Sequence, residues 1–235
     1  MLANKSILAV VPARGGSKGI KLKNLREVGG LSLVARTGKI IQQLPEIDAA
    51  VISTDHEMIA EEARQHGISA PFMRPPELSG DRIGDVEVLS HALLEAEKAF
   101  SRTFDVVLML QPTSPLRTAE HVRQCLRKFC DSDVDATWTV SETDSKAHPL
   151  KQLQLDASGE LELYDKAGMG IIARQQLKPL FHRNGVAYAI SRDCLLDKKS
   201  ISGDKFNAIV INELLANIDT EIDLKWAEFL LENLE

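Results

Sequence analysis

Over the first 140 residues, two kinds of segment follow one another, and they differ in how apolar and polar positions are arranged. Short apolar, β-branched runs predict strands at residues 7–11, 49–53, 105–110 and 136–140, with a brief extended piece at 70–73. Between them, apolar residues recur with helical periodicity, which predicts helices at residues 31–44, 57–66, 85–100 and 119–129. This strand–helix repetition predicts an α/β fold, a Rossmann-like, doubly wound and mostly parallel sheet.

The pattern changes after Val140. Residues 151–155 and 160–164 alternate polar and apolar around Asp156-Ala157-Ser158-Gly159, which predicts a hairpin. Later strands are expected at residues 187–190 and 208–211, and a closing helix at 223–231. We therefore expect a single domain over residues 1–235, with an inserted excursion at about 141–190 that covers the substrate or a second subunit.

Bulk composition narrows the function classes. The chain has 235 residues, 44% of them hydrophobic, which is enough for a substantial core. A formal net charge of -6 argues against nucleic acid or membrane as the main partner, and no apolar run is long enough to span a bilayer. The amino-terminal segment lacks the pattern of a signal peptide. Three cysteines without a Cys-x-x-Cys pair suit a reducing compartment, so we expect a cytoplasmic protein.

A glycine-rich, basic loop follows the first predicted strand. Glycines let backbone N–H groups turn inward around an anion, and arginine or lysine supplies the counter-charge that a triphosphate needs. Lysine-rich loops are also common solvated surface, but the carboxyl end of a buried strand is where α/β sheets place ligands. The spacing matches neither a P-loop nor Gly-x-Gly-x-x-Gly. The loop carries Arg14, Lys18, Lys21 and Lys23 among Gly15, Gly16 and Gly19.

Two other segments have a chemical as well as a structural interpretation. The two prolines of residues 110–117 fix a rigid turn that presents Gln111 and Arg117 toward the same crevice, or simply connect a strand to a helix. Near the carboxyl terminus, Asn217 and Asp219 lie two apart and offer oxygen ligands of the kind Mg²⁺ prefers. A helix cap at Asp219 or Thr220 would explain the same residues.

Together, these segments resemble the acylneuraminate cytidylyltransferases, the CMP-sialic acid synthetases. The resemblance spans essentially the whole chain, and its specificity comes from the number of motifs that occur in the family's order. These are residues 13–19 with Lys23-Asn24, then residues 53–55, 74–78, 110–117, 148–151, 174–176, 184–185 and 218–221.

The resemblance implies an Mg²⁺-dependent enzyme that joins CTP to a nine-carbon α-keto sugar acid and releases pyrophosphate. The anomeric hydroxyl would attack the α-phosphate in line, and the enzyme would be a homodimer with the excursion at its interface. The implied nucleotide contacts are Arg14, Gly15, Gly16, Ser17, Lys18, Lys23, Asn24 and Arg74, the last at the cytosine. The implied sugar contacts are Gln111, Lys151, Arg174, Asn184 and Tyr188; the metal ligands are Asp219 and Asn217; and the catalytic residues are Arg14, Lys23 and Asp219.

The chain departs from the family pattern at several positions. Asn217 stands where an aspartate is frequent, which removes one charge from the implied metal site, and Lys21 stands where a proline is common. The sugar is left open between a sialic, legionaminic, pseudaminic or octulosonic acid, as is a nucleotide-binding homologue with weak or no turnover. A nicotinamide-dependent oxidoreductase is disfavoured because the glycine spacing does not fit.

Overall fold

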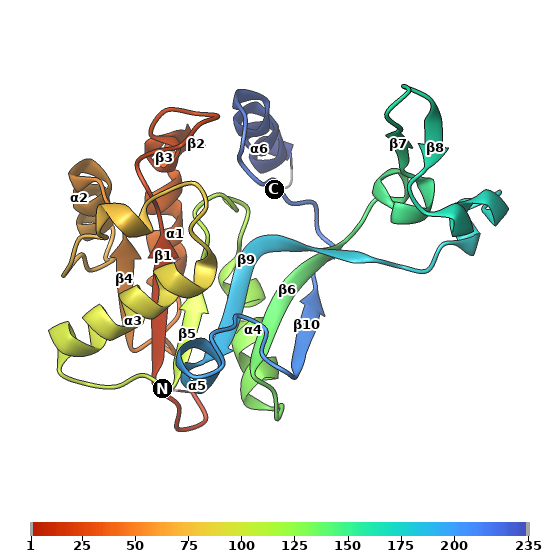
Figure 1. The fold of residues 1–235 in the computed structure, drawn as a ribbon. Helices are drawn as coiled ribbons and strands as arrows, with labels where there is room; N and C mark the ends of the chain where they lie inside the picture. Colours follow the sequence, from red (N-terminus) through yellow and green to blue (C-terminus); the bar gives the residue numbers. More distant parts are fainter. Residues whose placement is uncertain (1, 234–235) are drawn as a thin grey trace.

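A six-stranded sheet forms the centre of the computed structural model, which describes residues 2–233 (Figure 1). Its strands are β1 (Ile7–Pro12), β4 (Ala49–Ser53), β5 (Val106–Met109), β6 (Ala136–Glu142), β9 (Phe181–Ser191) and β10 (Phe206–Val210). They lie in the order β10-β6-β9-β5-β1-β4, and all neighbouring pairs are parallel except those that β9 makes with β5 and β6. The predicted Rossmann-like, mostly parallel sheet is therefore confirmed.

Helices cover both faces of this sheet. They are α1 (Leu33–Ile41), α2 (Glu57–Gln65), α3 (Asp85–Phe100), α4 (Ala119–Cys130), α5 (Arg192–Leu196) and α6 (Glu221–Asn233). Successive residues of β1 point to opposite faces, so that Ile7 and Ala9 pack in the cluster with α1, α2 and α4 while Leu8 and Val10 pack with α3 and α5. All four are fully buried, as expected for a strand covered on both sides. No helix within residues 2–233 combines the length and apolar character needed to cross a membrane.

Local signals explain where the predicted elements end. The expected helix at residues 31–44 begins later, because β3 (Leu31–Ser32) first pairs with β2 (Glu27–Val28) and the Ser32 hydroxyl then caps α1 by accepting from the Ala35 N–H at 2.9 Å. Thr118 caps α4 in the same way. The piece expected at residues 70–73 forms no strand; the chain pairs once at Ser69, which bridges to Val51.

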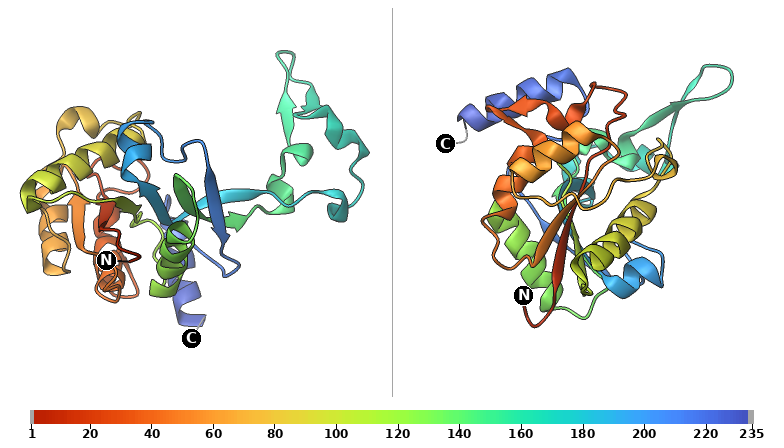
Figure 2. Two further views of the ribbon diagram at one scale, coloured as in Figure 1. Left: turned by 90° about the horizontal axis from the view of Figure 1, so that it is seen from below. Right: turned by 90° about the vertical axis from the view of Figure 1, so that its left-hand side faces the viewer.

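Residues 143–180 form an arm that projects from the sheet between β6 and β9 (Figures 1 and 2). The arm contains the predicted hairpin, β7 (Leu153–Leu155) paired with β8 (Leu161–Leu163), and several single turns of 3₁₀ helix. It is shorter than the excursion expected at 141–190, because β9 belongs to the central sheet. Residues 186–190 are buried between β5 and β6 and cannot be part of a projecting segment.

The sheet brings three connecting segments together at one edge, which is formed by the carboxyl ends of β1 and β5. β1 and β5 are parallel neighbours, so the basic loop after β1 and residues 110–117 after β5 begin side by side. The segment before α6 joins them through a hydrogen bond from the Ile218 N–H to the Thr113 carbonyl at 2.9 Å. Segments separated by nearly 200 residues thus meet where open α/β sheets bind ligands.

Candidate active site

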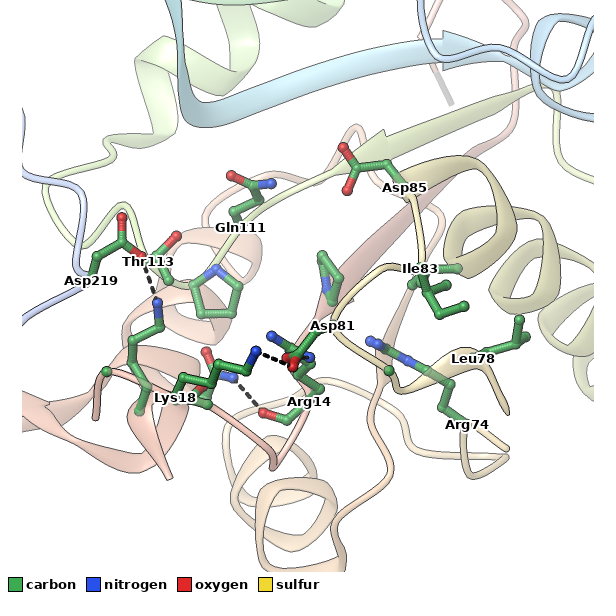
Figure 3. A pocket seen from close by; sticks show the side chains of 18 of the residues that line it. Arg14, Lys18, Arg74, Leu78, Asp81, Ile83, Asp85, Gln111, Thr113 and Asp219 are labelled. Atoms are coloured by element: carbon green, nitrogen blue, oxygen red, sulfur yellow. Dashed lines mark hydrogen bonds and ion pairs between the residues drawn. The ribbon is translucent and has the colours of Figure 1, made fainter. Parts of the chain in front are cut away.

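A polar cavity of about 560 Å³ opens at this edge of the sheet (Figure 3). Its walls come from the basic loop, the segment before α3, the loop after β5 and the segment before α6. Nine of the residues proposed from the sequence line it: Arg14, Ser17, Lys18, Lys23, Asn24, Arg74, Gln111, Asn217 and Asp219. The volume and the clustered cations suit a small, highly charged ligand.

The basic loop is held in place by contacts among its own residues and with the segment that follows β4. The buried Asn24 side chain donates to the Arg14 carbonyl at 3.1 Å, which closes the loop on itself. Gly15 donates its N–H to the Asp55 carboxylate at 2.7 Å, so this group anchors the loop and is not free for a phosphate. Gly15 and Gly16 do not line the cavity, although they lie in the loop that does.

Lys23 joins the first loop of the fold to the last. Its ammonium donates to the Ile218 carbonyl at 2.7 Å and to the Asp219 carboxylate at 2.9 Å. Between them the backbones approach so closely that a Cβ on Gly19 would lie 2.3 Å from the Asp219 carbonyl oxygen. Only glycine fits there, which explains one glycine of the loop by packing and not by anion contact.

Arg14 and Lys18 share one carboxylate partner that the sequence reasoning missed. Asp81 accepts from Arg14 at 2.7 Å and lies 2.5 Å from the Lys18 ammonium (Figure 3). The pKa of the Asp81 carboxyl is lowered by these contacts, with Lys18 contributing most. No motif pointed to Asp81, because an aspartate beside glycines in a loop is ordinary surface sequence.

Arg74 and an apolar wall form the side of the cavity near α3. The Arg74 guanidinium is buried and donates to the Ser53 hydroxyl at 3.0 Å and to the Ser53 carbonyl. Burial lowers its pKa to about 10, which leaves it charged at neutral pH. Leu78, Ile83 and Val88 line the cavity beside it. A fixed set of donors next to an apolar slot suits a flat heterocyclic ring.

Gln111 lines the opposite wall, and a buried arginine fixes its backbone. Arg117 donates to the carbonyls of Gln111 and Val186 at 2.5 Å and of Gly185 at 2.9 Å. Burial lowers the pKa of Arg117 to about 9. The sequence placed Arg117 toward the crevice, but the structure turns its side chain into the protein, where it ties β5 to β9.

Four of the implied sugar contacts lie outside the cavity. Asn184 is buried, accepts from Thr139 and donates to Ser141, and Tyr188 is a core residue whose hydroxyl accepts from the Gly185 N–H at 2.6 Å. Both support the wall that carries Gln111. Lys151 and Arg174 are exposed on the arm, where Arg174 lines a separate hollow.

Asp85, the first residue of α3, is a further cavity residue without a signal in the sequence. It accepts from Arg183 at 2.7 Å. The Arg183 guanidinium lies 5.2 Å from the ring centroids of both Trp138 and Tyr188. The two aromatic rings and the Asp85 carboxylate together hold the Arg183 guanidinium in place next to Asp85.

The possible metal ligands are few. Asp219 lies at the cavity edge with its side chain 67% exposed, and it accepts from the Asn217 amide at 3.2 Å. Within residues 2–233 no group of three or more His, Cys, Asp or Glu side chains is arranged to hold a metal ion. This arrangement fits a cation that takes most of its ligands from a phosphate chain, as Mg²⁺ commonly does.

Comparison with known proteins agrees with this geometry. The family described as cytidylyltransferase matches residues 8–233. The chain is 30% identical to a CMP-N,N'-diacetyllegionaminic acid synthase of Legionella pneumophila, covering 94% of this chain and 93% of that protein. It is also 30% identical to an N-acylneuraminate cytidylyltransferase of Streptococcus agalactiae, covering 92% of this chain and 51% of the other.

A solved structure of CMP:2-keto-3-deoxy-manno-octonic acid synthetase in complex with CTP has the same fold. Its TM-score is 0.72 at 15% sequence identity, with 98% of this chain and 100% of that one covered. The resemblance inferred from the motifs is thus confirmed at the level of the family. The chain belongs to the cytidylyltransferases and is a nucleotidyltransferase.

Proposed function

We propose that this enzyme joins CTP to a nonulosonic sugar acid, giving the CMP-sugar and pyrophosphate. The observation that carries the proposal is the convergence of Arg14, Lys18 and Lys23 in one cavity with the buried Arg74 and its apolar slot. The cations suit a triphosphate and the slot suits a pyrimidine. The names of the relatives support the sugar class, since they act on legionaminic and neuraminic acids.

The basic loop supplies electrostatic stabilisation in this scheme. Arg14, Lys18 and Lys23 hold the phosphates and neutralise the charge that accumulates on the departing pyrophosphate. Arg74 donates to the base from a position that Ser53 fixes. The sugar's anomeric hydroxyl attacks the α-phosphate in line, so the protein contributes orientation and charge and forms no covalent bond with the substrate.

Asp219 is the residue best placed to hold Mg²⁺, with the side-chain oxygen of Asn217 as a second ligand. Its carboxylate stands at the cavity edge, next to the cation that would touch the phosphates, Lys23. When bound, the ion would neutralise phosphate charge and polarise the reacting group. Asn217 gives an oxygen without a charge, so we expect weaker metal affinity than two carboxylates would provide.

The arm is proposed to complete the sugar site of a second copy in a homodimer. Gln111 is the implied sugar contact that lines the cavity, whereas Lys151 and Arg174 lie on the projecting arm (Figure 2). The arm also exposes large apolar side chains, with Ile172 at 94% and Met169 at 76%. Exposed apolar surface of this kind is typical of a protein interface. A two-fold dimer would cover it and bring both cations to the partner's cavity.

Pyrophosphate release is the direct test of the activity. The enzyme is incubated with CTP, UTP or GTP, with magnesium or EDTA, and with sialic, legionaminic, pseudaminic or octulosonic acid. We expect release with CTP and one or more of the nonulosonic acids, and little with UTP or GTP. CTP binding without turnover on any sugar acid would instead indicate a homologue that has lost activity.

Mixing two inactive variants tests whether the arm acts across the dimer. Arg174→Ala and Asp219→Ala are each expected to be nearly inactive. Unfolding and refolding the two variants together makes about half of all dimers mixed. If Arg174 serves the partner's cavity, each mixed dimer carries one intact site of its two, which restores about a quarter of wild-type activity. An arm that served its own cavity would leave the mixture as inactive as its parts. Lys166→Ala, elsewhere on the arm, is the control.

The cytoplasm remains our predicted compartment. The three cysteines are unpaired, and Cys125 and Cys194 are buried thiols. Burial raises the pKa of Cys125 to about 12 and that of Cys194 to about 11, so neither is a reactive thiolate at neutral pH. Unpaired thiols are what a reducing compartment favours.

A further inference from the structure

The segment between the Arg-Pro-Pro-Glu-Leu motif and α3 places a carboxylate inside the proposed phosphate site. Asp81 bridges Arg14 and Lys18 at 2.7 and 2.5 Å, and the Ser79 carbonyl accepts weakly from Arg14 at 3.5 Å. A carboxylate between two cations resembles, in charge and geometry, one phosphate oxygen pair of a bound nucleotide. Two of the cations that the proposed function assigns to the triphosphate therefore already have a partner (Figure 3).

The same segment has few contacts that would prevent Asp81 from moving away from Arg14 and Lys18. Gly80 and Gly84 lie within it on either side of Asp81, and among the described residues it has one internal backbone hydrogen bond, from the Ile83 N–H to the Gly80 carbonyl at 3.4 Å. The Asp81 side chain is 41% exposed. Its ion pairs hold it against Arg14 and Lys18, yet exposed ion pairs of this kind are weak. A ligand with several negative charges can replace the carboxylate.

We propose that Asp81 is an internal competitor for the triphosphate subsite and sets which nucleotides bind well. This inference rests on the proposed function. CTP and pyrophosphate carry the charge to displace Asp81 from Arg14 and Lys18, whereas CMP lacks the β- and γ-phosphates that would reach these cations. Asp81 thus lowers the apparent affinity for CTP and pyrophosphate and leaves the affinity for CMP unchanged. As pyrophosphate departs, the Asp81 carboxylate pairs with Arg14 and Lys18 again, and this assists product release.

Calorimetric titration of Asp81→Asn tests this competition. The probes are CTP, CMP and inorganic pyrophosphate, each with wild type and variant in EDTA. Because exposed ion pairs are weak, we expect Kd for CTP and pyrophosphate to fall by about three- to tenfold, and Kd for CMP to stay within twofold. Pyrophosphate should also become a stronger product inhibitor. Asp81→Ala should behave similarly, and Asp133→Asn, which removes an exposed carboxylate paired with Lys205 at 3.4 Å, should change none of these values.

The opposite result would identify Asp81 as a support for the two cations. In that case both Asp81 variants would bind CTP and pyrophosphate more weakly, and the inference would fail while the proposed function stood. Equal tightening of all three ligands would also overturn it, because a general gain of positive charge would explain that. If CTP did not bind but the variants gained affinity for pyrophosphate, the competition would stand and the proposed substrate would be wrong.

Discussion

Asp219→Asn is expected to lower kcat/KM for CTP-dependent pyrophosphate release by about 100-fold or more. Losing one oriented charge next to a reacting phosphate typically has an effect of this size. The substitution keeps the size of the side chain and removes the charge that faces Lys23 at 2.9 Å. If Asp219 holds the metal, the magnesium concentration needed for half-maximal rate should also rise. Initial rates measured against CTP and magnesium in turn separate the two effects.

Lys23 provides the matched comparison for this experiment. Lys23→Met removes the same ion pair from the other side, so it should lower activity without a comparable change in magnesium dependence. Asn217→Asp adds a second carboxylate beside Asp219 and should shift the magnesium requirement downward. An Asp219→Asn enzyme that kept near wild-type activity and an unchanged magnesium response would show that the metal assignment is wrong.

Arg117→Met is expected to lower the free energy of unfolding by about 3–5 kcal/mol. Substitutions that break a buried hydrogen-bond network are among those with effects of this size. The substitution removes the donor shared by the carbonyls of Gln111, Gly185 and Val186. Methionine fills part of the volume but donates no hydrogen bond, so two buried carbonyls and the partly buried one of Gln111 lose this donor. Urea unfolding followed by circular dichroism gives the change in the free energy of unfolding.

Arg117→Lys should recover only part of this loss, because an ammonium cannot match the planar fork of a guanidinium. Arg127→Met, on the exposed face of α4, is the control and should cost less than about 1 kcal/mol. A small effect for Arg117→Met would mean that water replaces the guanidinium. The junction between β5 and β9 would then not depend on this residue.

Periodicity predicted most of the fold because most elements are locally encoded. The helix at residues 85–100 and the strand at 49–53 appear with the expected bounds. The helix is determined by one apolar face with helical periodicity, and the strand by one short apolar run. β9 was predicted only in part, at residues 187–190. Its first half, 181–186, begins with exposed and polar residues and becomes a strand only by pairing with β6, which a local pattern cannot reveal.

The candidate site divides in the same way. Arg14, Lys18 and Lys23 could be predicted because glycines and cations cluster in sequence at the end of a buried strand. Asp81 and Asp85 could not, since their role depends on which cations the fold places opposite them. Tyr188 illustrates a different limit: family resemblance identified the position, but the register of β9 turns its ring into the core.

The place where the arm leaves the sheet bears on how such enzymes diversify. Glu142 and Phe181 face each other at the last rung of the β6–β9 ladder, so in topology the arm is only the tip of a very long hairpin. Insertions, deletions or wholesale exchange of that tip need not alter the pairing beneath it. Given the acceptor role proposed for the arm, exchanging this tip should change which sugar acid is used and leave the nucleotide cavity unchanged.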